Sequence, residues 1–165
     1  MTPTLARRYT IAGIELVGGL FGVGFAVTAM QGASSWLWRL VALAILCFYA
    51  ASFAAGWLLL RDHPWGAELS LYLQVPQLVF VYTDTVAYNI YTDFSASLSW
   101  TTPLHFNLDF TTGSNATLSV LNSFEHLTFG VNLAAVVILW QLLAYLDAQD
   151  AAAAPPPLRS HGGAV

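Results

Sequence analysis

The chain has 165 residues, of which 57% are apolar and only 8% carry a charged side chain, against about a quarter in an ordinary soluble domain. So few charged residues cannot cover the surface of a soluble protein of this size, and the mean hydropathy of +0.63 agrees with this. The composition excludes a soluble globular domain and predicts an integral membrane protein, with the lipid bilayer as its first partner.

The remaining composition excludes several classes of function. Five basic residues and a net charge of −4 provide no basic patch for DNA or RNA, so we expect no nucleic-acid partner. The single cysteine, Cys47, can neither form an internal disulfide nor perform paired-thiol exchange. The sequence has no Gly-rich phosphate loop, nucleophile elbow or HExxH motif. We therefore expect no enzymatic activity, no metal and no cofactor.

Four apolar segments are predicted to cross the membrane, because a helix needs about 20 mostly apolar residues to span the hydrocarbon. These segments lie at about residues 9–30, 36–60, 69–91 and 127–146. The third is the most polar, and its alternative is a re-entrant or surface-lying segment. The predicted fold class is an all-α membrane protein, a four-helix transmembrane bundle forming one domain over residues 1–146.

The positions of the arginines predict the orientation, because cytoplasmic loops are enriched in basic residues. With four spans, one side of the membrane receives Arg7, Arg8, Arg61 and Arg159. Only Arg39 lies near the other side. We therefore expect a multi-pass protein of the plasma (cell inner) membrane with both termini in the cytoplasm and a disordered tail over residues 147–165. The rival interpretation of the first segment as a cleavable signal peptide is disfavoured by its long apolar run.

The loop between the third and fourth predicted helices, residues 92–126, changes its hydrophobic period from 3.6 to 2. Apolar and polar residues alternate in the stretches 94–100 and 104–110, and turn residues at 111–115 precede a third short stretch. These patterns predict a small extracytoplasmic antiparallel β-sheet. Its apolar face should lie over the outer end of the helices, dip into the interface, or pair with a partner.

Charged side chains inside the predicted spans are candidates for function, because each needs a partner in hydrocarbon. Three are present: Glu15, Arg39 and Asp84. Their depths predict a pair between Arg39 and Asp84, with outward snorkelling of Arg39 as the alternative. Glu15 and Gln74 lie at similar depths, which permits a hydrogen bond between them.

A polar stripe follows one face of the third predicted helix. Its members, spaced three or four residues apart with Val81 among them, are Gln74, Gln77, Asp84 and Tyr88. Either this stripe is a hydrogen-bonded seam between helices, or it lines a polar cavity for a ligand or ion. Together with Glu15 and Arg39 it forms the candidate intramembrane polar site. Pro76 predicts a kink beside it.

Small residues in the first helix indicate a close helix contact. Gly18, Gly22 and Ala26 repeat every four residues, which predicts tight packing within the bundle first and a homodimer second. The missing catalytic motifs and the amphipathic sheet favour a non-catalytic accessory or interaction protein. Its protein partner or second copy would bind through the sheet or this small-residue face. The alternative is a small transporter or binder of an apolar or weakly polar ligand, using the stripe of the third helix.

Overall fold

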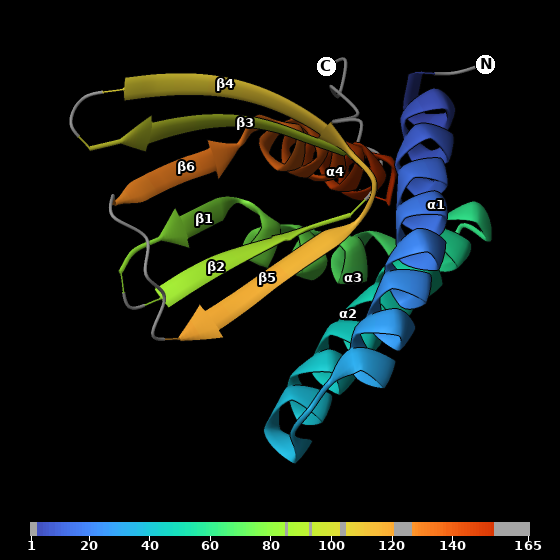
Figure 1. The fold of residues 1–165 in the computed structure, drawn as a ribbon. Helices are drawn as coiled ribbons and strands as arrows, with labels where there is room; N and C mark the ends of the chain where they lie inside the picture. The colour runs from blue at the N-terminus through green and yellow to red at the C-terminus, as the bar shows by residue number, and fades with distance from the viewer. Residues whose placement is uncertain (1–2, 85, 93, 103–104, 121–126, 154–165) are drawn as a thin grey trace, which may run out of the picture.

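The computed structural model describes residues 3–84, 86–92, 94–102, 105–120 and 127–153 (Figure 1). Within them lie four α-helices, three of which are long and apolar enough to cross a membrane, and one antiparallel sheet. The helical elements are α1 (Pro3–Gly32), α2 (Trp36–Leu60), α3 (Pro64–Gln74), the 3-10 turn η1 (Val75–Gln77) and α4 (Leu133–Ala153). The strands are β1 (Val79–Tyr82), β2 (Val86–Tyr91), β3 (Phe94–Thr101), β4 (His105–Thr112), β5 (Asn115–Val120) and β6 (Thr128–Asn132).

The first two helices form an antiparallel hairpin, and small residues allow their close approach. The bounds of α2 are those predicted, whereas α1 begins at Pro3 rather than at residue 9 and ends at Gly32. A Cβ added at Gly19 would lie 2.5 Å from the backbone nitrogen of Phe53. The predicted small-residue face packs inside this hairpin, because Gly22 lies against the ring of Tyr49 and Ala26 is fully buried. A small residue at both positions suits the close approach of α1 and α2.

The predicted third helix over residues 69–91 is wrong. The helix α3 begins at Pro64 and ends at Gln74, and its 11 residues cover only about 16 Å. Pro76 lacks an N–H and sits in the 3-10 turn that follows, so it ends the helix instead of kinking it. The segment beyond it, VFVYTDTVAYNIY, is dense in β-branched and aromatic residues and forms β1 and β2.

The fourth helix also begins later than predicted. Residues 128–132 form β6, and α4 starts at Leu133 rather than at residue 127. The side chain of Asn132 caps this helix, because its oxygen accepts hydrogen bonds from the backbone nitrogens of Ala134 (3.1 Å) and Ala135 (3.4 Å). The helix continues to Ala153, so the predicted disorder is wrong for residues 147–153. The rest of the predicted tail lies outside the described residues.

The sheet has six strands instead of the three that the sequence predicts, in the order β4-β3-β6-β1-β2-β5, and every neighbouring pair is antiparallel. The additional strands come from the two segments assigned above to helices. The fold therefore mixes helices and strands and is not all-α, although the sheet does lie between the third and fourth helices in sequence, as predicted.

The sheet is folded so that two halves meet at one end. Consecutive strands β4 and β5 form its opposite edges, and only Gly113 and Ser114 separate them; Gly113 has a φ of +97°. Figure 1 shows the half β6-β3-β4 and the half β1-β2-β5 converging beside α1 and diverging away from it.

Two hydrogen bonds attach the convergent end of the sheet to the helical hairpin. Ser114 donates to the carbonyl of Gly18 (2.7 Å), and the Tyr49 hydroxyl donates to the carbonyl of Tyr91 (3.1 Å). Both helical residues lie near the middle of their helices, within the candidate spans Leu5–Gly32 and Trp36–Leu60. The sheet therefore lies beside the hairpin and does not cover its end.

The close contact in the hairpin predicts that Gly19→Ala lowers the free energy of unfolding by about 1–3 kcal/mol, because the added methyl group meets backbone that cannot move aside. The matched control is Gly24→Ala, since a Cβ at Gly24 meets nothing within 4 Å and alanine improves helix propensity. Thermal unfolding in mild detergent measures both. Equal melting temperatures for the two variants would contradict the packing described here.

Candidate functional site

A buried carboxyl group joins three helices. Glu15 on α1 is fully buried, and its Oε1 accepts hydrogen bonds from the hydroxyl of Ser70 (2.6 Å) and the amide of Gln74 (2.9 Å), both on α3. Its Oε2 accepts from the hydroxyl of Ser52 on α2. The hydrogen bond expected between Glu15 and Gln74 is thus present, and sequence reasoning missed the two serines because side-chain depth alone does not reveal them.

The Glu15 cluster, formed by Glu15, Ser52, Ser70 and Gln74, is closed. Each of its four residues is at most 1% exposed, so the carboxyl group has no route to a substrate. A buried carboxyl needs such donors because burial without them is costly. Chemically the cluster can hold α3 against the hairpin, but it offers no reactive group to a ligand.

Two other residues of the predicted stripe, Gln77 and Tyr88, form hydrogen bonds where the helical segment meets the sheet. The side-chain oxygen of Gln77 accepts hydrogen bonds from the backbone nitrogen (2.8 Å) and the hydroxyl (3.1 Å) of Thr92. The hydroxyl of Tyr88 donates to the carbonyl of Pro76 (2.6 Å). The bonds of Gln77 connect η1 to Thr92, just after β2, and the bond of Tyr88 connects η1 to β2 itself.

The predicted pair between Arg39 and Asp84 is wrong. Both residues belong to the described part of the chain, where no ion pair joins them. Arg39 is exposed near the start of α2, and Asp84 is exposed at the turn between β1 and β2. The prediction assumed a helix reaching residue 84, whereas the helix ends ten residues earlier. The candidate polar site therefore divides into separate local contacts and is not one constellation.

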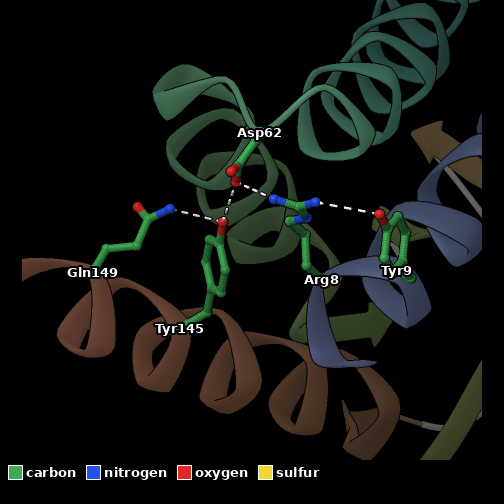
Figure 2. A network of polar contacts seen from close by, with 5 residues as sticks. All are labelled: Arg8, Tyr9, Asp62, Tyr145 and Gln149. Carbon is green, nitrogen blue, oxygen red and sulfur yellow. Dashed lines mark hydrogen bonds and ion pairs between the residues drawn. The ribbon is translucent and has the colours of Figure 1, made fainter. Parts of the chain in front are cut away.

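A second polar network, which sequence reasoning missed, joins the ends of three helices (Figure 2). Arg8 on α1 forms an ion pair with Asp62, which lies two residues beyond the end of α2. The hydroxyl of Tyr145 on α4 donates to the same carboxylate oxygen (3.2 Å) and accepts from the amide of Gln149 (2.7 Å). Arg8 also lies over the ring of Tyr9, 5.1 Å from its centroid.

This network explains why Arg8 is buried although it is charged. The sequence signal was its place in the basic pair Arg7-Arg8, which predicted the orientation of the chain. The hydrogen bond from Arg8 holds the pKa of the Asp62 carboxyl below its usual value of 3.8. The ionised pair thereby fixes the first turns of α1 to the end of α2 and the last turns of α4.

The largest uncovered feature is one face of the sheet. The strand register places its large apolar residues together, with side chains 40–70% exposed; these residues are Val79, Val86, Leu98, Phe106, Leu108, Phe110 and Phe129. The opposite face is at most 9% exposed at Phe80, Ala87, Tyr91, Ser95, Ser97, Ser99 and Asn132. We call the first set the apolar sheet face and the second the inner sheet face.

This distribution is the reverse of that in a soluble protein, where the apolar face is buried and the polar face meets water. Small and hydroxyl side chains lie inside, and the ring of Phe80 lies over Gly130 on the neighbouring strand. Alternation with apolar residues outward and polar residues inward is typical of sheets that contact lipid. No protein-family model matches the chain, and no match was found among curated proteins or among solved structures.

The Glu15 cluster predicts a large effect of Glu15→Ala on stability. The substitution leaves the hydroxyls of Ser52 and Ser70 and the amide of Gln74 buried without their acceptor, at a cost of about 1–3 kcal/mol for each. The control is Glu68→Ala, which removes an exposed carboxyl from α3. We expect a clearly lower melting temperature in detergent for the first variant only, and similar melting of both would refute the structural role of Glu15.

The Arg8–Asp62 pair predicts a pH-dependent contribution to stability. Because the folded-state pKa of Asp62 lies below 3.8, the contribution is complete above that pH and is lost as the pH falls through the lowered pKa. Asp62→Asn should therefore melt at a lower temperature than the wild type at pH 7, and the difference should shrink below about pH 4. Asp147→Asn, which removes an exposed carboxylate of α4, should show no such pH-dependent difference.

Proposed function

We propose that the chain is a multi-pass protein of the cell inner membrane with a non-catalytic interaction role, and that its interaction surface is the β-sheet. The observation that carries this proposal is the inverted sheet, whose apolar face is exposed while its inner face is buried except along the edge strand β4. A face of this composition is unstable in water and needs lipid or a partner against it.

Continuity with the helices supports a lipid environment for the apolar sheet face. Leu20 and Phe21, near the middle of α1, are 62% and 63% exposed, which suits side chains in contact with acyl chains. The sheet is attached to the hairpin at this same level, through Gly18 and Tyr49. If α1 and α2 cross the bilayer, the sheet lies at membrane depth rather than wholly in the extracytoplasmic space.

The same arrangement supports two termini on the cytoplasmic side. The network of Arg8, Asp62 and Tyr145 gathers the start of α1, the end of α2 and the last turns of α4. The start of α4 lies against Ile14, halfway along α1. In this topology α1 and α2 cross the membrane, α3 enters from the cytoplasmic side, and α4 returns the chain to that side after the sheet.

The polar contacts favour the interaction role over transport. The alternative of a small transporter needs a cavity against Asp84, Gln77 and Tyr88. Gln77 and Tyr88 are engaged by Thr92 and the carbonyl of Pro76, and Asp84 lies away from them at an exposed turn. Glu15, the most buried acidic group, is enclosed by its own donors.

Spin-label accessibility tests the membrane placement. In a Cys47→Ser background, nitroxides at Leu98 and Phe129 should collide with oxygen and be protected from a water-soluble nickel chelate in reconstituted vesicles, because both positions face lipid. Phe21 is the matched lipid-exposed control, and Glu68 is the water-exposed control. Nickel accessibility at Leu98 and Phe129 equal to that at Glu68 would overturn the proposal, and protection from both reagents would indicate a covering protein.

A further inference from the structure

The edge strand β4 is the most exposed element of the sheet. It pairs with β3 on one side, and no other strand among the described residues pairs with it on the other. All eight of its residues are exposed, on both faces. The opposite edge, β5, differs because Ala116 lines a hollow together with residues at the end of α1 and the start of α2, including Gly32 and Trp38.

An open edge is costly in the environment proposed above. Along one side of β4, the outward-pointing N–H and C=O groups have no strand partner in the part of the chain that the structure describes. Hydrocarbon offers them no hydrogen bonds, so open sheet edges do not occur in contact with lipid. Even in water, a long edge strand that carries Phe106, Leu108 and Phe110 invites pairing with another strand. A further strand along β4 would satisfy these groups.

The sequence of β4 is complementary to itself. Phe-Asn-Leu-Asp-Phe, residues 106–110, reads the same in both directions except that Asn107 stands where the reverse has Asp109. Two antiparallel copies centred on Leu108 bring each Phe106 opposite the partner copy's Phe110 and each Asn107 opposite the partner copy's Asp109. The amide can then donate to the carboxylate, and aromatic and leucine pairs form on the apolar face.

The neighbouring strand continues this pattern. Leu98 already pairs with Leu108, and Trp100 pairs with Phe106. A second copy would therefore extend the apolar sheet face across a two-fold axis, with no charge on it. If the two strands were instead centred on Asp109, the carboxylates of the two copies would lie opposite each other, which disfavours that register.

We propose that two copies of the chain associate through antiparallel pairing of their β4 strands, centred on Leu108, to form one continuous twelve-stranded sheet. Such an interface uses the same surface on both copies, as a two-fold dimer requires. This inference rests on the proposed interaction role and names its partner, a second copy.

Cross-linking in membranes tests the register. In the Cys47→Ser background, Leu108→Cys should form a disulfide-linked dimer with copper phenanthroline, whereas Phe106→Cys alone should not, because its copies are offset along the strands. Co-expressed Phe106→Cys and Phe110→Cys chains should link to each other. Linkage of Leu108→Cys to Ala116→Cys, which lies on the same face of the sheet in β5, would show pairing of unlike edges and overturn the proposal.

A charge swap tests the same interface without cysteines. Asn107→Asp places a carboxylate opposite Asp109 of the other copy, and this happens twice in the dimer. The repulsion should weaken the dimer roughly tenfold, as measured by native mass spectrometry at several protein concentrations. Adding Asp109→Asn restores an amide opposite each carboxylate and should recover the dimer. Both sites are exposed, so the variants should keep the wild-type melting temperature. A monomeric wild type, or no recovery in the double variant, would overturn the proposal.

The two proposals fail separately. If the Leu108→Cys link is absent while labels at Leu98 and Phe129 still report lipid, the dimer is refuted and the membrane placement of the sheet stands. If those labels report water, the proposed function fails whatever the cross-linking shows.

Discussion

The carboxyl group of Glu15 decides where the short helix α3 is held against the helical hairpin. Its three donors come from α2 and α3, so it holds the end of the short helix α3 against the middle of the α1–α2 hairpin. An acidic side chain buried among apolar residues is stable only with such partners. Everything that follows Gln74 therefore begins at that level of the hairpin, and the sheet is positioned by this contact.

Two residues then limit the sheet within the chain. Pro76 prevents α3 from continuing, and the side chain of Asn132 satisfies the first backbone nitrogens of α4. Between them the chain forms six strands whose convergent end is fixed to the carbonyl of Gly18 and to Tyr49. The network of Arg8 and Asp62 closes the other end of the helices, where α4 returns. The apolar sheet face is thus the consequence of anchoring a sheet beside apolar helices instead of beyond them.

Sequence patterns predicted the helical hairpin closely, because its two segments are long, apolar and separated by a clear turn. They also predicted three of the six strands from strict alternation in residues 94–120. The segment after Pro76 was assigned to a helix because its length and apolarity suit a membrane span equally well, and hydrophobicity does not distinguish a buried strand from a buried helix. The β-branched and aromatic residues between Val79 and Tyr91 were the signal for strands.

The predictions of contacts between side chains were likewise correct only where the predicted helix was correct. Depth along a helix was enough to relate Glu15 to Gln74, because the predicted third helix is helical as far as Gln74. It failed for Arg39 and Asp84, because the depth of Asp84 was counted along a helix that ends at Gln74. The contact of Arg8 with Asp62 and Tyr145 joins residues far apart in sequence, and no local pattern records it.

By itself, the sequence determined that this chain has segments long and apolar enough to cross a membrane, that its first two helices form a hairpin, and that one face of its β segment is apolar. These are properties of composition and period, which depend on each residue and its near neighbours. Only the tertiary structure decided that this apolar face points outward and that β4 is an open edge. Both depend on pairing between strands distant in the chain, such as β1 with β6 and β2 with β5, and on where Glu15 and Gly18 hold them.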